Sequence, residues 1–278
     1  MKRRLAVVLV SLAALSVGTA LAYDVNKDLV NLGSISVYDV TVVLTDVENV
    51  TGTYTGDFHT ATPSTQVVGG ASRTVISFSN YQGTNAAVPP GQKVHIGWST
   101  SDHSSNIRDM YWTLLDGSRA GLSVVYNITN GYSYPGTHQI VLQWVHEMVP
   151  AIAAPVRARI SNVRYRFFGT AVPLDNLNAA NPNLADGNMN LLDAGPIDIN
   201  AGVLAERSIG VAPSGPFVVV KYDVTQPDGL SDGSSTDYVQ FQLWLVPTLS
   251  EWGTVAVVVL LLGTGAWLIY RRRVMTQA

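Results

Sequence analysis

The chain has 278 residues, no cysteine and only 13% charged residues, fewer than most soluble domains carry. The absence of cysteine excludes disulfides, thiolate nucleophiles and cysteine-ligated zinc. Residues 23–245 hold 11 Lys and Arg against 19 Asp and Glu, a net charge of −8 with neutral histidines. This acidic middle argues against binding to nucleic acid, which needs clustered positive charge.

The N-terminus is typical of a secretory signal. Three basic residues precede the uncharged, apolar run Leu5–Val17, and small residues stand at Ala20 and Ala22. These are the three parts of a cleavable signal peptide, which we assign to residues 1–22. We expect cleavage after Ala22, with Tyr23 as the first residue of the mature chain. An uncleaved membrane anchor is the alternative, because the apolar run is long.

Between the two ends, the hydrophobic pattern has a period of two, which is typical of β-strands. Ile140, Leu142 and Trp144 would share the core face of one strand, and Val239–Leu243 alternates in the same way with its glutamines outward. Two further triplets each share one strand face, namely Val40, Val42 and Leu44, and Val94, Ile96 and Trp98. Other strand candidates are Val67–Phe78, Met110–Leu115, Leu122–Ile128, Val156–Phe168, Ser208–Ala212 and Phe217–Thr225.

Gly and Pro turn signals separate these candidates, and no segment between the ends has the pattern of a long amphipathic helix. We therefore predict an all-β fold over residues 23–245, an antiparallel β-sandwich that is immunoglobulin-like in the broad sense. It would form one large domain or two small ones. An Ala-rich stretch framed by Pro150 and Pro155 marks a sub-domain boundary near residues 148–155.

No motif in this region indicates an enzyme. Asp102-His103-Ser104-Ser105 contains the residue types of a catalytic triad, but triads are assembled from separate segments. There is no nucleophile elbow, phosphate loop or His-Glu-x-x-His sequence. The histidines, at positions 59, 95, 103, 138 and 146, are interpreted as scattered surface residues. We predict a non-enzymatic domain without a cofactor or metal, whose core includes Trp98, Trp112 and Trp144.

Four arginines form the one basic cluster of the acidic middle. Arg157 and Arg159 would share one strand face, and Arg164 and Arg166 the opposite face unless a bulge intervenes near Ser161-Asn162. Contact with an anionic extracellular polysaccharide is one interpretation. The other, which we favour, is an exposed or edge strand protected by charge.

The stretch from Asp175 to Asp193 is rich in asparagine and is predicted to be a long loop. Within it, Asp186-Gly187-Asn188-Met189-Asn190 places oxygen ligands at alternate positions, as a calcium loop does. The glycine and glutamate that an EF-hand needs at its sixth and twelfth positions are replaced by Leu191 and Ile197. A polar surface loop is therefore favoured over a calcium site.

The C-terminus contains a predicted transmembrane helix over residues 253–270. This segment carries no charge, and 18 helical residues span about 27 Å, close to the hydrocarbon thickness of a bilayer. The cluster Arg271, Arg272 and Arg273 follows at once. Because positive residues stay in the cytoplasm, we expect a single pass with the N-terminal side outside and the C-terminus inside.

A short motif precedes this helix. It consists of Val246, Pro247, Thr248 and Leu249, two variable residues, and then Trp252 and Gly253. Together with the apolar helix and the arginine cluster, residues 246–273 resemble the IPTL-CTERM sorting domain, found at the C-terminus of many exported Gram-negative proteins. Val246 stands in place of the usual isoleucine, and the resemblance does not extend to residues 23–245.

The resemblance implies a partner, an exosortase-type membrane protease/transpeptidase that acts on such signals, often in bacteria that make extracellular polysaccharide. The chain would then be its substrate, held in the inner membrane and afterwards moved to the cell surface or extracellular matrix. Pro247 disfavours helix at Val246 and so leaves an extended, accessible segment before the helix. The alternative is a permanently anchored membrane protein with a periplasmic binding module.

Overall fold

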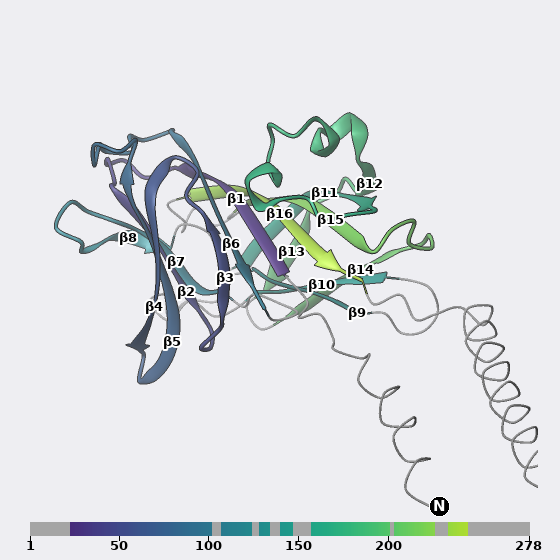
Figure 1. Ribbon diagram of the computed structural model, residues 1–278, viewed down its shortest axis with the longest axis horizontal. Coiled ribbons are helices and arrows are strands. Elements are labelled where there is room, and N and C mark those ends of the chain that lie inside the picture. The colour runs from purple at the N-terminus through teal and green to yellow at the C-terminus, as the bar shows by residue number, and fades with distance from the viewer. Residues whose placement is uncertain are drawn as a thin grey trace, which may run out of the picture. The chain divides into compact units, whose positions relative to one another are not determined.

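The computed structural model describes residues 23–101, 107–123, 128–133, 140–146, 157–200, 203–225 and 233–243. In these residues the protein is all-β, with strands β1 to β16 in antiparallel sheets and three short 3₁₀ turns (Figure 1). The largest sheet has the strand order β12-β11-β15-β16-β1-β6-β3, and β13 also pairs with β11. Its strands are β1 (Tyr23–Asn31), β3 (Val50–Tyr54), β6 (Lys93–Thr100), β11 (Arg157–Phe168), β12 (Asn190–Asp193), β13 (Ile197–Asn200), β15 (Phe217–Thr225) and β16 (Gly233–Gln242).

Two smaller sheets complete the described part of the chain. The five-stranded sheet has the order β4-β5-β2-β7-β8, with β2 (Asp39–Leu44), β4 (Phe58–Val68), β5 (Ala71–Tyr81), β7 (Ile107–Thr113) and β8 (Arg119–Ser123). The three-stranded sheet has the order β14-β10-β9, with β9 (Ile128–Ser133), β10 (Ile140–His146) and β14 (Leu204–Ile209). The described residues as far as Gln242 belong to one compact unit, and a second unit begins at Leu243.

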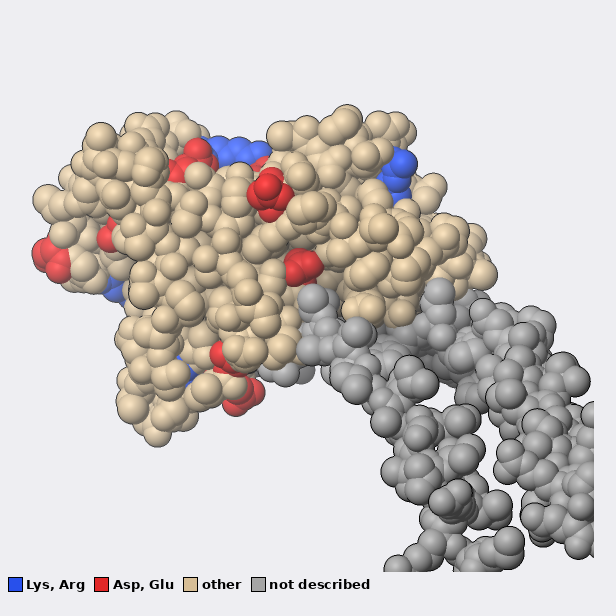
Figure 2. All heavy atoms as spheres, viewed as in Figure 1, with Lys and Arg blue, Asp and Glu red and all other residues tan. Residues whose placement is uncertain are grey.

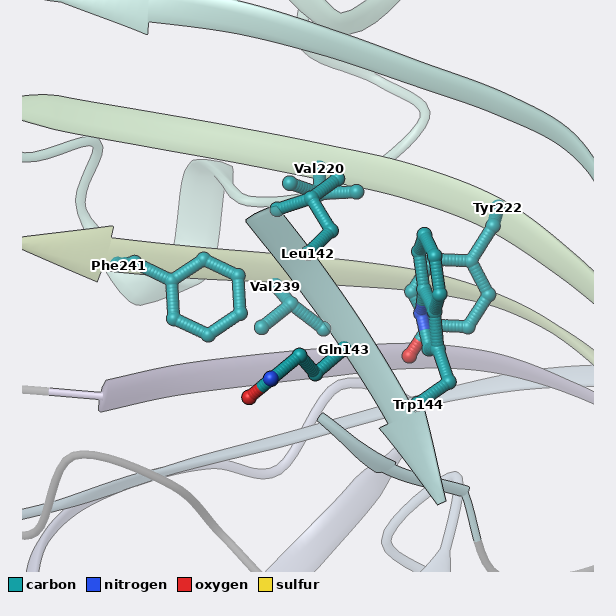
Figure 3. Close-up of a pocket in the computed structure, with 7 residues that line it drawn as sticks. All are labelled: Leu142, Gln143, Trp144, Val220, Tyr222, Val239 and Phe241. Atoms are coloured by element: carbon teal, nitrogen blue, oxygen red, sulfur yellow. The ribbon is translucent and has the colours of Figure 1, made fainter. Parts of the chain in front are cut away.

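β10 packs across the core face of the eight-stranded sheet. Leu142 and Trp144 point from β10 toward Val220 and Tyr222 on β15 (Figure 3). The rings of Trp144 and Tyr222 meet edge to face with centroids 5.9 Å apart, a favoured aromatic geometry. The space between these side chains is too small for a water molecule. The alternation predicted for this strand is thus confirmed, with Leu142 and Trp144 buried and Gln143 hydrogen-bonded to Glu206 at the surface.

β1 lies at the centre of the largest sheet, between β16 and β6, and all its residues except Val30 are buried. On the core face, Lys27 lies directly opposite Asp237 of β16, and the two side chains form an ion pair that is 2% and 0% exposed. Ser235 donates a second hydrogen bond to the Asp237 carboxylate at 2.6 Å. A buried charge is tolerated only when it is paired and hydrogen-bonded in this way.

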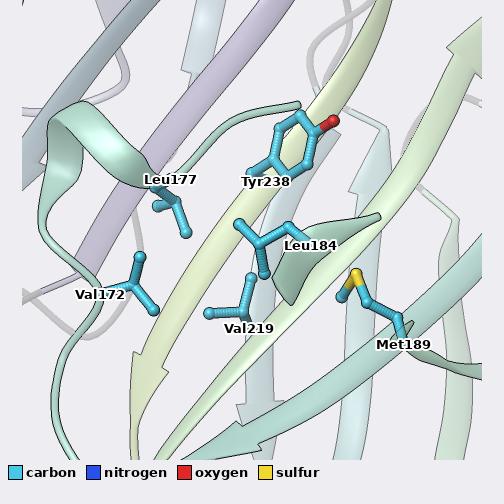
Figure 4. Close-up of a cluster of buried hydrophobic side chains, with 6 residues drawn as sticks. All are labelled: Val172, Leu177, Leu184, Met189, Val219 and Tyr238. Carbon is cyan, nitrogen blue, oxygen red and sulfur yellow. The ribbon is translucent and has the colours of Figure 1, made fainter. Parts of the chain in front are cut away.

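The opposite face of the sheet is covered by residues 172–189, which we name the cap segment. It contains three 3₁₀ turns, η1 (Leu174–Asn176), η2 (Pro182–Leu184) and η3 (Asp186–Asn188). Its apolar side chains form a buried cluster with Val219 of β15 and Tyr238 of β16 (Figure 4). The cap members of this cluster are Val172, Leu177, Leu184 and Met189. The segment predicted to be a long polar loop is therefore anchored by an apolar core of its own.

The predicted strands agree with the structure to different degrees. β15 has the predicted bounds, Phe217–Thr225, and Trp98, Trp112 and Trp144 are buried as predicted. The strand predicted over Val67–Phe78 is instead the end of β4 and most of β5, because Gly69 and Gly70 turn the chain with φ values of 62° and 82°. Both angles lie in the left-handed region that glycine adopts without a steric penalty.

Two other expectations were wrong. Gln240 was expected to point outward but is 1% exposed, because the cap segment covers it. No strand was expected at β1, although it is the most deeply buried strand of the sheet. Its sequence alternates apolar with polar residues but carries Lys27 on the apolar side, which weakens the pattern.

The predicted signals fall outside the described residues. This applies to residues 1–22 with Ala20 and Ala22, to the motif at positions 246–253, to the helix over 253–270 and to Arg271, Arg272 and Arg273. It also applies to the sub-domain boundary near 148–155, although the eight-stranded sheet takes strands from both sides of it. Within the described ranges, no helix is long and apolar enough to cross a bilayer.

The buried ion pair gives a test of the fold. Lys27→Met leaves the Asp237 carboxylate buried without its partner, so we expect a loss of about 3–5 kcal/mol in the free energy of unfolding. Replacing both residues with apolar ones, Lys27→Met with Asp237→Leu, should restore most of that loss. Urea unfolding followed by tryptophan fluorescence measures both. A double variant as unstable as the single one would contradict the assignment.

Candidate functional site

A β-bulge in β11 decides where the four arginines lie. The register with β15 shifts between Ser161 and Arg164, and Asn162 adopts a φ of 54°. Before the bulge, Ala158 and Ile160 are buried, and after it Val163 and Tyr165 are buried. Odd-numbered residues therefore face away from the core before the bulge, and even-numbered residues do so after it. All four arginines thus lie on one face of the strand, as the sequence allowed only with a bulge near Ser161-Asn162.

Arg164 and Arg166 bind the cap segment, and Arg159 binds the strand β13 that follows it. Arg164 donates to the backbone carbonyl of Asp186 at 2.8 Å, and Arg166 donates to those of Asn183 and Asn188 at 3.2 and 3.0 Å. Arg159 forms a bidentate pair with Asp198 of β13, at 2.7 and 3.0 Å. β11 lies between β15 on one side and β12 and β13 on the other, so the interpretation as an edge strand was wrong. Arg164 and Arg166 thus hold the cap on the sheet.

The calcium interpretation of Asp186 is not supported by its surroundings. Its carboxylate accepts a hydrogen bond from Nζ of Lys221 at 2.5 Å and lies 3.6 Å from Nε of Arg164. The hydrogen bond from Lys221 lowers the pKa of Asp186. Burial acts in the opposite direction, but its effect is smaller. The carboxylate thus pairs with two basic side chains. Among the described residues, no cluster of His, Asp and Glu could hold a metal ion.

The bulge residue gives a second prediction. The Asn162 side chain donates to the carboxylates of Asp186 and Asp223 and accepts a hydrogen bond from Arg164. Asn162→Gly removes these hydrogen bonds but keeps a residue that accepts a positive φ. Asn162→Val removes the same bonds and also places a β-branched residue in the left-handed region, which costs about 1–2 kcal/mol more. We expect the valine variant to unfold at lower urea concentration than the glycine variant. Equal midpoints for the two would contradict the backbone conformation described for residue 162.

The cap-covered face of β1 is polar. Asp24, Asn26 and Asp28 alternate along it. Asp24 accepts hydrogen bonds from Ser99 of β6 at 2.5 Å and from Gln240 of β16 at 2.6 Å. Gln240 in turn accepts the backbone N–H of Val172 at 2.7 Å, and Asn26 donates to the carbonyl of Leu174 at 2.9 Å. The polar residues of β1 therefore fix the cap segment at its first turn.

Asp28 lies at the base of an open groove of about 420 Å³ between this sheet and the cap. The groove is lined by β1 and β6 below, by the turn between β3 and β4 on one side and by the cap on the other. Its lining residues are Asp28, Tyr54, Gly56, Asp57, Lys93, His95, Asp175, Asn176, Asn178, Ala179 and Ala180. Its volume is in the range of small-molecule sites, and charged, amide and phenol side chains dominate its lining.

The turn between β3 and β4 is locked against β6. Gly56 has a φ of 56°, and a Cβ atom there would lie 1.8 Å from the carbonyl oxygen of His95, so only glycine fits. The next residue, Asp57, accepts the backbone N–H of His95 through Oδ2 at 2.8 Å. Tyr54 packs its ring edge-on against the imidazole of His95, with centroids 5.3 Å apart. These contacts fix one wall of the groove.

Asp28 is 4% exposed and interacts with two basic groups, Nδ1 of His95 and Nζ of Lys93. Burial acts to raise the pKa of Asp28, but the hydrogen bonds and charges of His95 and Lys93 outweigh it and hold the pKa below its usual value. The carboxylate is therefore ionised at neutral pH.

The phenol of Tyr54 lies near three carboxylates of the groove. Burial first, and then the charges of Asp175, Asp57 and Asp28, raise the pKa of Tyr54. Because these carboxylates come from three separate segments of the chain, no local sequence pattern predicts that they converge. His95 was interpreted as a surface histidine, but it is 15% exposed and lines this groove.

The segment Asp102–Ser105 lies outside the described residues.

The low pKa of Asp28 predicts a pH dependence of stability. A group whose pKa is lowered by folding stabilises the fold while it is ionised, so its contribution is lost as the pH falls. We expect the free energy of unfolding to decrease between about pH 5 and pH 2, and Asp28→Asn to flatten that decrease. Unfolding curves at several pH values measure this, with Asp46→Asn, in the exposed loop after β2, as the control. A profile unchanged by Asp28→Asn would contradict the account.

Charged groups are sparse on the face shown in Figure 2, where acidic and basic side chains occur in small separate patches.

Comparison with known proteins assigns no family or function to the chain. No protein-family model matches the chain, and no curated protein or solved structure is significantly similar to it.

Proposed function

We propose that this chain is an exported bacterial surface or matrix protein and a substrate of an exosortase-type membrane protease/transpeptidase. The observation that carries the proposal is the order of features in residues 246–273: Pro247-Thr248-Leu249, Trp252-Gly253, an uncharged helix-length run and three arginines. The region between the signals is proposed to be a non-enzymatic β-sandwich, immunoglobulin-like in the broad sense, that the two signals deliver to the envelope.

The limits of the folded strands support this proposal. β1 begins at Tyr23, directly after Ala22, and β16 ends at Gln242, a few residues before Val246. Removal of both predicted signals would therefore leave every described strand intact. The register pairs Tyr23 with Phe241, so the start of β1 and the end of β16 lie at the same end of the sheet. In the precursor, both membrane-directed segments would leave the domain from that end.

The proposed route has two stages. The precursor would first be held in the inner membrane as a single-pass protein, with the domain outside and Arg271 to Arg273 in the cytoplasm. The sorting enzyme would then act at the motif, and the domain would move to the cell surface or extracellular matrix. The catalytic groups of that step belong to the enzyme, and this chain supplies only the recognised segment.

A second candidate is a permanently anchored protein whose domain is a periplasmic binding module. The polar groove at Asp28 favours a binding role in either case, because it has the volume of a ligand site and a fixed wall. The two candidates differ in the fate of the C-terminal helix, which remains attached only in the second.

The motif can be tested by localisation. In cells with a working sorting enzyme, Pro247→Ala with Thr248→Ala should leave export and folding intact but retain the protein in the inner membrane. Ser250→Ala, at a variable position of the same motif, is the matched control and should be released like the unaltered chain. Cell fractionation with immunoblotting measures both. Release of the double variant at the normal level would refute the role given to the motif.

A further inference from the structure

We propose that strand β4 pairs with the β4 strand of a second copy of this chain, so that the two five-stranded sheets join into one continuous sheet. Three features of β4 support this pairing: the exposure of the strand, the direction of its backbone groups and its lack of charge. The pairing is independent of the proposed sorting of the chain.

β4 is a long sheet edge. It stands at one end of the order β4-β5-β2-β7-β8, so within the described sheets only one of its two sides has a neighbouring strand (Figure 1). It runs for 11 residues, whereas the other edge strands of these sheets have four to six. Between Thr62 and Val67 every residue except Ser64 is exposed, on both faces of the strand. An uncovered edge of this length is a template for another strand.

The hairpin turn determines which backbone groups of β4 point outward. Val68 and Ala71 flank the two-residue loop Gly69-Gly70, and a loop of this kind is closed by hydrogen bonding between the residues that flank it. Hydrogen-bonded and non-hydrogen-bonded pairs then alternate along an antiparallel ladder. The β4–β5 register is continuous from Val68 back to Thr60. The even-numbered residues of this stretch therefore bond to β5, and the odd-numbered residues point their N–H and C=O groups away from it.

A second contact agrees with this alternation. The backbone N–H of Thr74, which lies opposite Thr65, bonds to the carbonyl of Asp46 at 3.0 Å and not to β4. The pair is therefore a non-hydrogen-bonded one, as the alternation requires. Pro63 also occupies an outward position, so its missing N–H costs the β4–β5 ladder nothing.

The outward backbone groups are complementary to themselves. When two copies of β4 run antiparallel about a two-fold axis at Ser64, Ala61 exchanges both hydrogen bonds with the partner's Val67. Thr65 donates to the carbonyl of the partner's Pro63. Every outward N–H of residues 61–67 then has an acceptor, although the proline supplies no donor.

This match selects the register. A shift of two residues in one direction places Pro63 opposite the partner's Pro63, and a shift in the other places Ala61 opposite the turn glycine at position 69, so hydrogen bonds are lost either way. Because the same edge serves in both copies, the interface is closed and produces a dimer.

The side chains of the edge do not oppose such pairing. Residues 60–72 contain no charged side chain, although residues 23–245 carry 11 Lys and Arg against 19 Asp and Glu. Proteins usually protect sheet edges with charges, bulges or prolines, and this stretch has only Pro63. In the two-fold register Thr62 lies opposite the partner's Gln66 and Ser64 opposite the partner's Ser64, so no like charges meet.

Disulfide cross-linking of the full chain in a mild detergent tests the interface and its register. The chain has no cysteine, so an introduced cysteine is its only thiol. Ser64→Cys should form a covalent dimer on a non-reducing gel after mild oxidation, because its Cβ atom lies about 4.5–5.5 Å from that of the partner. Thr62→Cys and Gln66→Cys should each remain monomeric on the gel, whereas a mixture of these two variants should form the dimer.

A charge at the two-fold axis tests the same interface by disruption. Ser64→Lys, added to both members of the Thr62→Cys and Gln66→Cys mixture, places two ammonium groups opposite each other and should reduce the cross-linked fraction at least about fivefold. Ser72→Lys is the matched control, because it adds the same charge at an exposed position of β5, one strand away from the edge. It should leave the cross-linked fraction unchanged.

Three outcomes would overturn the proposal: no dimer from Ser64→Cys, equal cross-linking of Thr62→Cys or Gln66→Cys alone, or full cross-linking of the folded mixture that carries Ser64→Lys. Circular dichroism melting of each variant establishes that it is folded. Association through the predicted C-terminal helix would not distinguish between neighbouring positions of β4. The cross-linking pattern therefore tests the edge, whether or not the C-terminal motif is processed.

Discussion

The burial of β1 on both faces is the constraint on which the rest of the structure depends. A strand with an apolar side and a polar side is stable at the centre of a sheet when its buried polar side chains find partners. On the core face, Lys27 meets that condition through Asp237 of the neighbouring strand. On the opposite face, Asp24 and Asn26 bind the groups that hold the cap segment, and Asp28 binds the two basic residues at the base of the groove.

The cap and the groove follow from this arrangement together with one extra residue in β11. The bulge at Asn162 brings Arg164 and Arg166 to the same face as the polar side of β1, where they bind backbone carbonyls of the cap. The cap is thus held at one end by β1 and β16 and at the other by β11. Its first turn brings Asp175 into the lining of the groove together with Asp57.

Sequence reasoning predicted the all-β character and the strands with the clearest alternation. β15 and the core positions of Trp98 and Trp144 were predicted because every second residue is apolar and a turn signal follows. β1 was missed because its buried polar side chains are satisfied by residues that lie some 70 and 210 positions away in the chain, which a local pattern cannot reveal. Whether the four arginines share one face of β11 depended on a bulge that the sequence allowed but did not require.

The groove illustrates even more clearly that local sequence patterns do not predict contacts between distant segments. Asp28, Asp57, His95 and Asp175 share no local motif, and only the sheet order brings them together. The predicted terminal signals are the opposite case, since each is contiguous and was inferred from composition and spacing, which a sequence displays directly. The account of the chain therefore has two parts, with delivery inferred from the termini and binding inferred from the fold.

The central claim is that the domain is delivered and then released from its membrane helix. Peptide mass spectrometry of the protein from the surface fraction of cells with a working sorting enzyme tests it most directly. The account predicts an N-terminal peptide that begins at Tyr23 and no peptide that contains the apolar run or Arg271 to Arg273. Recovery of intact peptides that extend from Leu245 through Trp252 to the triple arginine would contradict it.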